Sequence, residues 1–322
     1  MLFVQRISVT HFSDPGCPWA YSAAPALATL RWRYGAQLDW RLVLIGLTED
    51  AQQYVDRGYT PLSNARGYLR FRRFGMPFAT APKRRVAATS RACRAIVAAR
   101  LEDPALEGSA FRALQLAQFT TTVVLDDDDD LVTALDAVEG LDARATVARI
   151  DAADVVAAYE ADRALARTAA GSPTEFQGKA AQTDGPVRYT APSLLFERDG
   201  RRLEAGGFQP VEAYDVVIAN LYPQLERRAA PADPLEALEA EPDGLVTAEV
   251  AAILREGNDA PDPAAAEDAL IEAAARGDAI RVAVGDDAVW YAARYADVAV
   301  RRLRASSRAA VNGVVPPASA RS

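Results

Sequence analysis

The chain has few of the residues that build metal centres and disulfide frameworks. Its 322 residues include two cysteines, Cys17 and Cys93, and one histidine, His11. These counts exclude a disulfide framework, a Cys/His zinc cluster, an iron–sulfur site and a multi-histidine metal centre. A Ser-His-Asp triad would have to use His11. We therefore expect no bound metal and no tightly bound cofactor.

Long apolar runs are also absent, because no stretch reaches the roughly 18 residues of a membrane span. The N-terminus lacks the basic and apolar segments of a signal peptide. We expect no membrane partner and a cytoplasmic location, where thiols stay reduced. The Ala- and Arg-rich composition is typical of a high-GC bacterium.

A net positive charge is lacking as well, since 36 Lys and Arg stand against 44 Asp and Glu, a formal net charge of −8. Most of it falls on residues 231–322, where nine Arg stand against sixteen Asp and Glu, a net of −7. A surface that binds the phosphate backbone of a nucleic acid needs a positive charge. The chain also lacks a P-loop and a GxGxxG motif. We expect no nucleic-acid partner and no nucleotide.

The first forty residues have the pattern of a βαβ unit. Residues 5–12 (QRISVTHF) indicate a strand, and Asp-Pro-Gly at 14–16 is typical of a turn. A helical pattern over 18–34 has Pro at its first turn and Gly at its end, and residues 38–44 indicate a second strand. The sheet should therefore begin with two parallel strands and a right-handed crossover.

Residues 48–182 form a predicted helical block between sheet elements. Its predicted helices cover 82–101, 106–120, 131–138 and 141–168. Strands then follow at 193–198 and 201–205 around an Asp-Gly turn, which is a strong hairpin signal, and a closing helix covers 209–228.

The remaining segment, 231–322, begins with a proline-containing linker. Helices are predicted at 247–256 and 264–276, a hairpin at 280–293, and a basic helix near 297–305. Two helices followed by a hairpin are typical of a winged helix-turn-helix domain. Its acidity disfavours DNA binding, so we interpret it as a packing or partner-docking module, and its three clustered arginines (301, 302 and 304) as a solvated helix end.

Cys17 has the strongest chemical signal, because it lies at a strand-to-helix junction directly before Pro18. Free N–H groups in the first helical turn stabilise an anion there. Such a position lowers a thiol pKa from about 8.5 into the range of roughly 3.5–7.5. At a pKa of about 6 the thiolate share at neutral pH would rise from about 3% to about 90%. The alternative is a buried cysteine that acts as a small apolar residue, as we expect for Cys93.

Residues 11–21 (HFSDPGCPWAY), 190–196 (TAPSLLF) and 206–210 (GGFQP) resemble the DsbA-like branch of the thioredoxin superfamily. The resemblance covers about residues 1–230 and implies an α/β, thioredoxin-like fold with a large all-helical insertion. The small winged-helix-like domain, 231–322, would follow it. The resemblance also implies that Pro192 is cis and faces Cys17. The backbone of Ala191 would then pair with a bound peptide or thiol.

One departure from the family pattern narrows the chemistry. Dithiol members have Cys-x-x-Cys, and here Ala20 replaces the second cysteine, which would resolve a mixed disulfide. An external thiol would have to do so instead. The predicted function is a monothiol oxidoreductase that acts on a small thiol or a disulfide-bearing substrate. Glutathione or mycothiol would be its co-substrate.

Two alternatives stay open. Kappa-class glutathione transferases and 2-hydroxychromene-2-carboxylate isomerases resemble this chain but hold the glutathione thiolate with a Ser where Cys17 lies. The first alternative is therefore a thiol-dependent isomerase or transferase. The second is a non-catalytic scaffold that docks a partner through its acidic tail. The oligomeric state is open between a monomer and a homodimer.

Other candidate site residues surround this centre. Pro18, Trp19 and Ala20 are further candidate substrate-binding residues, with Trp19 as a wall. Pro192 would position the substrate, and Arg84 and Arg85 could receive its carboxylates. The two arginines belong to a basic and aromatic set, for which a solvated helix face is the alternative: Arg66, Arg70, Arg72, Arg73, Lys83, Arg84 and Arg85, with Tyr68, Phe71 and Phe74.

His11 and the acidic run 126–130 complete the candidates. His11 could lower the pKa of Cys17, or else its side chain points into the core or the helical block. The five aspartates lack the ligand spacing and the glycine of a calcium loop, so we interpret them as the acidic start of a helix.

Overall fold

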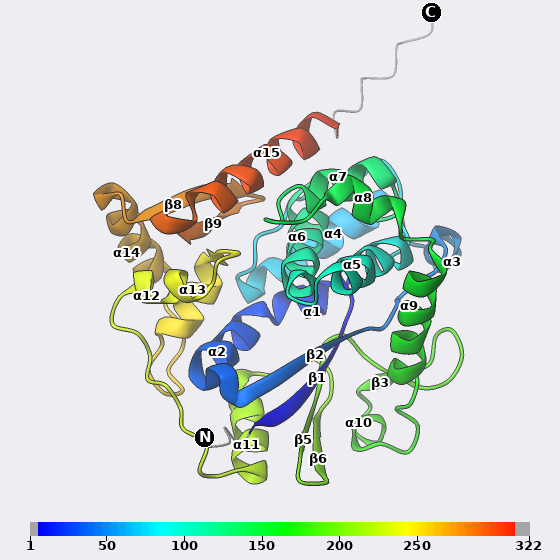
Figure 1. Ribbon diagram of the computed structural model, residues 1–322, viewed down its shortest axis with the longest axis horizontal. Coiled ribbons are helices and arrows are strands. Elements are labelled where there is room, and N and C mark those ends of the chain that lie inside the picture. Colours follow the sequence, from blue (N-terminus) through cyan, green and yellow to red (C-terminus); the bar gives the residue numbers. More distant parts are fainter. Residues whose placement is uncertain (1–5, 313–322) are drawn as a thin grey trace, which may run out of the picture.

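A four-stranded sheet forms the centre of the computed structural model, which describes residues 6–312 (Figure 1). Strand β1 (Ile7–Ser13) pairs in parallel with β2 (Leu38–Leu44) and antiparallel with β5 (Ser193–Arg198), which continues through a hairpin into β6 (Arg201–Ala205). The strand order is β2-β1-β5-β6. Asp199 and Gly200 both have positive φ angles, as a tight two-residue hairpin requires. The predicted βαβ unit and hairpin are confirmed.

Helices α1 (Pro18–Ser22), α2 (Ala24–Tyr34) and α11 (Val211–Leu221) follow the strands in the positions that the sequence predicts. The predicted first helix is interrupted near Ala23, which separates α1 from α2. The closing helix ends at Leu221 rather than at 228, because Pro223 follows and disfavours helical backbone in the residue before it. α2 and α11 share a buried core with the apolar side chains of β1 and β5.

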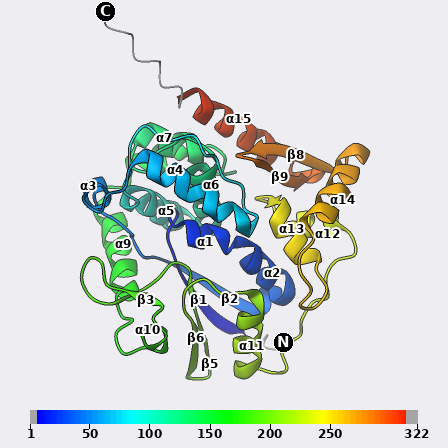
Figure 2. The same cartoon turned by 180° about the vertical axis from the view of Figure 1, so that it is seen from behind.

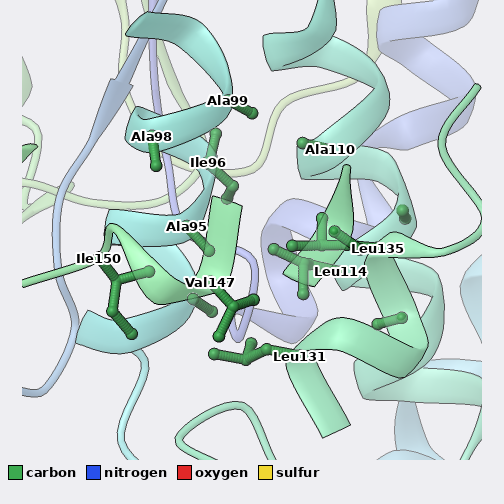
Figure 3. Packing of buried hydrophobic residues seen from close by; sticks show 14 of the residues in the cluster. Ala95, Ile96, Ala98, Ala99, Ala110, Leu114, Leu131, Leu135, Val147 and Ile150 are labelled. Carbon is green, nitrogen blue, oxygen red and sulfur yellow. The ribbon is translucent and has the colours of Figure 1, made fainter. Parts of the chain in front are cut away.

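The insertion between β2 and β5 is almost all helical, and a buried apolar cluster holds its helices together (Figure 3). Its elements are α3 (Ala51–Asp56), α4 (Pro61–Phe71), α5 (Ser90–Glu102), α6 (Leu106–Thr120), α7 (Asp128–Leu135), α8 (Ala143–Ala148), α9 (Ala153–Ala166) and α10 (Pro173–Phe176), with a small hairpin of β3 (Ala180–Ala181) and β4 (Arg188–Tyr189).

Three sequence predictions for the insertion need correction. The helix predicted from residue 82 begins only at Ser90, because residues 82–89 form a loop held by ion pairs to the acidic run. The segment 141–168 contains two helices, α8 and α9, rather than one. Helices α3 and α4 were not predicted, and Figure 2 shows α4 beside α1.

The C-terminal segment contains a three-stranded sheet with the order β7-β9-β8 and four helices. Its elements are α12 (Pro234–Ala240), β7 (Leu245–Val246), α13 (Thr247–Leu254), α14 (Pro263–Arg276), β8 (Ala279–Val284), β9 (Asp287–Ala292) and α15 (Ala296–Asn312). Sequence reasoning missed α12 and β7 but found the others. The three clustered arginines are not a helix end, because α15 continues to Asn312 and Arg302 is buried. The winged-helix interpretation and the domain boundary at residue 230 stay predictions.

This segment packs against both other parts of the chain. Trp32 of α2 shares a core with Trp290 of β9, and Phe119 of α6 shares another with the opposite face of the small sheet. Arg112 of α6 forms an ion pair with Glu249 of α13 (2.7 Å), whose side chain is fully buried. The C-terminal segment therefore holds the helical insertion in a fixed position relative to α2.

None of the helices in the described part of the chain combines the length and apolar character that a membrane span requires.

Candidate active site

The turn that carries Cys17 is organised by the buried carboxylate of Asp14. Its Oδ1 accepts a hydrogen bond from the Gly16 N–H (2.8 Å), and its Oδ2 accepts from the Leu47 N–H (2.8 Å) and the Thr89 hydroxyl (2.9 Å). These contacts join the turn to the end of β2 and to the start of α5. A Cβ on Gly16 would lie 2.4 Å from Thr89 Cγ2, so glycine fits beside this methyl group and a larger residue would displace it. Sequence reasoning treated Asp14 as turn chemistry alone.

Cys17 is the N-cap of α1, and its side chain faces the loop before β5. The residue is 6% exposed, and its Sγ donates a hydrogen bond to the Ala191 carbonyl (3.2 Å). The Ala191–Pro192 peptide bond is cis, as the family resemblance implies. The structure therefore brings together Cys17, Ala191 and Pro192, which lie far apart in the sequence.

The expected low pKa of Cys17 is wrong. Burial and, to a smaller extent, the nearby Asp14 carboxylate raise the pKa of this thiol to about 12. The backbone N–H groups of Ala20 and Trp19 lower it, as a helix start should, but they are outweighed by the loss of water around the sulfur. The resting thiol is therefore neutral at physiological pH.

A pocket of about 520 Å³ lies between the Cys17 turn and the insertion. Gly16, Pro18 and Trp19 line one side, so the pocket borders both neighbours of Cys17. None of its lining residues, all of them in the described part of the chain, is acidic. The basic and aromatic lining residues are Arg57, Lys83, Arg85 and Arg188, with Trp19, Tyr54, Tyr59, Tyr68 and Phe71. In a chain with a net charge of −8, this lining favours an anionic ligand.

Trp19 forms a wall of this region, in the place that the sequence predicts. Its indole is 42% exposed and packs in an aromatic cluster with Phe71 (4.9 Å between ring centroids), Phe74 (5.6 Å) and Phe208 (5.6 Å). This aromatic cluster links α1, the insertion and the loop before α11. Such contacts fix the indole beside the pocket.

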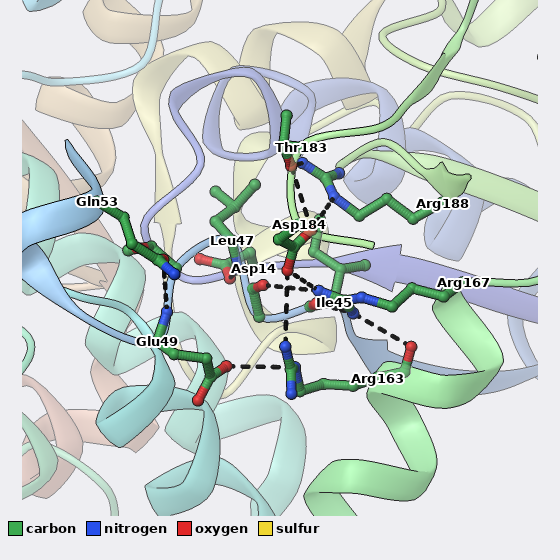
Figure 4. Close-up of polar contacts among 12 residues, drawn as sticks. Asp14, Ile45, Leu47, Glu49, Gln53, Arg163, Arg167, Thr183, Asp184 and Arg188 are labelled. Atoms are coloured by element: carbon green, nitrogen blue, oxygen red, sulfur yellow. Dashed lines mark hydrogen bonds and ion pairs between the residues drawn. The ribbon is translucent and has the colours of Figure 1, made fainter. Parts of the chain in front are cut away.

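Arg188 is a pocket residue that sequence reasoning missed. It is buried, and its positive charge lowers the pKa of Cys17. Figure 4 shows it near Asp184, which also faces Arg163 and Arg167. Its guanidinium donates to the Thr183 hydroxyl and faces Asp184, and the sequence gives neither contact a signal of its own.

Of the two arginines predicted to bind the carboxylates of the substrate, only Arg85 lies at the pocket. Arg84 is held by Asp127 (2.8 Å) and Asp130 (2.6 Å) and does not line the pocket, which corrects its assignment as a substrate-binding residue. Arg85 lines the pocket and pairs with Asp126 (2.5 Å). The acidic run is the start of α7, as predicted, with Asp127 as its N-cap.

His11 lies against Trp40 and Phe111, with ring centroids 6.4 and 6.3 Å away, so its side chain points toward the helical block. Burial and, to a smaller extent, the positive charge of Arg31 lower its pKa to about 3. A neutral imidazole carries no charge that could lower the pKa of Cys17. The catalytic role considered for His11 is thus replaced by the alternative, a packed strand side chain.

Neither Ala20 nor Cys93 supplies a second thiol on helix α1 beside Cys17. Ala20 is buried and does not line the pocket, which corrects its assignment as a substrate-binding residue. Cys93 is fully buried in α5, and its Sγ lies 3.6 Å from the Asp14 carboxylate, as expected for a packing residue. Within residues 6–312, no group of three or more His, Cys, Asp or Glu side chains is placed to hold a metal ion.

Comparison with known proteins gives one family and several similar folds. The family profile of the DSBA-like thioredoxin domain matches residues 8–189. A crystal structure of a candidate protein disulfide isomerase from Nitrosomonas europaea is 18% identical, with a TM-score of 0.51 over 68% of this chain and 98% of that one. At this identity the likeness concerns the fold alone. No curated protein matches this chain.

Two further solved structures have lower TM-scores. The cytosolic disulfide reductase DsbM from Pseudomonas aeruginosa is 19% identical, with a TM-score of 0.47 over 66% of this chain and 98% of that one. A candidate DsbA oxidoreductase from Streptomyces coelicolor is 16% identical, with a TM-score of 0.49 over 68% of this chain and 91% of that one.

Proposed function

The chain belongs to the family of DSBA-like thioredoxin domains, and we propose that it is a thiol oxidoreductase that uses Cys17 as its single reactive cysteine. The supporting observation is the placement of Cys17. Its sulfur contacts the residue before cis-Pro192, beside a pocket that is lined by basic and aromatic residues and by no acidic ones. A small anionic thiol or disulfide, such as glutathione or mycothiol in its disulfide form, fits that lining.

The proposed reaction is thiol–disulfide exchange in two steps. The Cys17 thiolate attacks one sulfur of the substrate disulfide, the S–S bond breaks, and the other sulfur leaves as a thiolate. A second small thiolate then attacks the mixed disulfide, releases a new disulfide and returns Cys17 to its reduced form. The second thiol must be external because Ala20 has no sulfur. Such a cycle suits the cytoplasm, where small thiols keep cysteines reduced.

Exchange requires that Cys17 lose its proton, and the structure shows what resists this. With a pKa of about 12, roughly one thiol in 10⁵ is ionised at pH 7. The hydrogen bond from Sγ to the Ala191 carbonyl stabilises the neutral form. A substrate N–H that takes this carbonyl would remove that stabilisation, and Arg188 would favour the thiolate. Activation would therefore accompany substrate binding.

The neutral thiol favours a second candidate function, a thiol-dependent isomerase or transferase. In this scheme Cys17 stays protonated and turns its S–H from the Ala191 carbonyl toward the sulfur of a bound small thiolate. The pocket would supply the charges that hold the carboxylates of that thiol. No covalent bond to the protein forms.

Two measurements separate these functions. After incubation with glutathione disulfide or mycothiol disulfide, mass spectrometry should find one adduct on Cys17 in the wild type and in Cys93→Ala, and none in Cys17→Ala. No adduct on Cys17, or equal labelling of Cys93, refutes the exchange function.

Calorimetric binding of reduced glutathione tests the second candidate with a matched pair of variants. Cys17→Ser keeps a hydrogen-bond donor and should retain binding, while Cys17→Ala should weaken it about tenfold, the effect of one hydrogen bond to a charged sulfur. Equal binding by both variants refutes that function. If the wild type forms no adduct and binds no glutathione, the non-catalytic scaffold is favoured.

A further inference from the structure

Lys83 is an unusual residue in this chain because nearly all of its basic side chains are arginines. The sequence has 34 arginines and two lysines, Lys83 and Lys179. An arginine stays charged in a protein, whereas a lysine becomes a neutral nucleophile when its environment disfavours the charge. Lys83 lines the pocket beside Cys17, and Lys179 is exposed.

The surroundings of the Lys83 amine fit its neutral form. Nζ donates to Gln118 Oε1 (2.9 Å) and to the Val123 carbonyl. The Gln118 amide is oriented by its own donation to the Tyr68 hydroxyl (3.2 Å), and Tyr68 and Gln118 both line the pocket. A neutral amine has two N–H groups and one lone pair. The two acceptors use both N–H groups and leave the lone pair.

The charges near Lys83 do not supply a partner for an ammonium ion. Lys83 forms no ion pair among the described residues, because the Asp130 carboxylate is held by Arg84 (2.6 Å). Burial lowers the pKa of Lys83 to about 7; Asp130 opposes this effect and Arg84 adds to it. Tyr68 has a pKa raised by burial to about 12 and stays neutral. About half of the amine is therefore unprotonated at pH 7.

The same pocket can bind the carboxylate of a ligand. Arg57 donates to the Thr183 carbonyl (3.3 Å) and has no acidic partner among the described residues. Arg85 and Arg188 add two more guanidinium groups to the lining. A ligand that carries a carboxylate would therefore be held within the pocket that contains the amine.

We propose that Lys83 is a reactive group of this pocket and forms a Schiff base with the carbonyl carbon of a small carboxylated aldehyde or ketone. The amine nitrogen forms a bond to that carbon, and the carbonyl oxygen leaves as water with the two amine protons. A proton from solvent then gives the iminium ion, whose N–H can still donate to Gln118. The reaction shares the pocket of the proposed function but does not depend on Cys17.

Reductive trapping of the folded, full-length chain tests this inference. The protein is incubated with glyoxylate, a carboxylated aldehyde, and sodium cyanoborohydride, which delivers hydride to the iminium carbon, and peptides are mapped by mass spectrometry. At pH 7 Lys83 should be modified at least about ten times faster than Lys179, because an ordinary lysine with a pKa near 10.4 is about 0.04% unprotonated. Equal or slower labelling of Lys83 overturns the proposal.

Three controls make the result specific. Acetaldehyde, which has no carboxylate, should label Lys83 several-fold more slowly than glyoxylate; equal rates overturn the assigned ligand class. Lys83→Arg should abolish the pocket adduct, while Lys179→Arg should leave it unchanged; an adduct that follows Lys179 refutes the assignment. Cys17→Ser should be trapped like the wild type, and loss of trapping in that variant would show that Lys83 does not act independently of Cys17, contrary to the proposal.

Discussion

Alkylation of Cys17 by iodoacetamide at pH 7 should be about three orders of magnitude slower than that of an ordinary cysteine. Only the thiolate reacts, and an unperturbed thiol with a pKa near 8.5 is about 3% ionised at pH 7. With the pKa of Cys17 raised to about 12 by burial, roughly one thiol in 10⁵ is ionised. The ratio of these fractions gives the expected factor.

The pH profile separates this effect from poor access to the buried sulfur. If the pKa limits the reaction, the logarithm of the rate should rise by one per pH unit from pH 7 to beyond pH 10. If access alone limits it, the rate should level off near pH 9 at a low value. Peptide mapping would assign the label to Cys17 rather than Cys93, and the chain unfolded in urea gives the ordinary rate. A plateau at or below pH 9 would refute the reasoning.

Three further substitutions test the packing around the site. Gly16→Ala should lower the free energy of unfolding in urea by about 1–3 kcal/mol and disturb the Cys17 turn, because its Cβ would meet Thr89 Cγ2 at 2.4 Å. Thr89→Ser removes that methyl group, so the double variant should recover most of the lost stability. Arg112→Ala leaves the Glu249 carboxylate buried without its partner and should cost about 3–5 kcal/mol, so a change below about 1 kcal/mol would contradict the importance of this pair. Trp19→Ala removes the contacts of the aromatic cluster and should lower the free energy of unfolding by about 1–3 kcal/mol. It should also weaken glutathione binding in calorimetry, and unchanged binding would exclude Trp19 from the ligand site.

The sequence predicts those elements whose signals are local. The hairpin at Asp199-Gly200 follows from two residues that accept positive φ angles, and the βαβ unit follows from alternation, a proline at a helix start and a glycine at its end. Helix α4 also has a local signal, which sequence reasoning missed: Thr60 and Ser63 form a capping box around Pro61.

Two predictions about the chemistry of Cys17 failed for different physical reasons. Alternation along a strand places His11 and Phe12 on opposite faces, but only the fold, which packs Phe12 beside Cys17, shows that His11 points away from it. The raised pKa of Cys17 could not have been deduced from the sequence either. It depends on how completely distant segments remove water from the sulfur, and the local helix-start effect has the opposite sign.

Burial acts in opposite directions on the two candidate reactive groups, Cys17 beside the pocket and Lys83 in its lining. It raises the pKa of the Cys17 thiol and lowers that of the Lys83 amine, so both groups favour their neutral forms. The pocket's arginines, by contrast, remain positively charged. Attraction of an anionic ligand and chemistry on that ligand are therefore assigned to different side chains. A substitution at Arg57 should accordingly weaken glyoxylate trapping at Lys83 through ligand affinity, whereas the pH at which trapping is half-maximal should stay near 7. A shift of that midpoint by more than about one unit would show that the two roles are coupled.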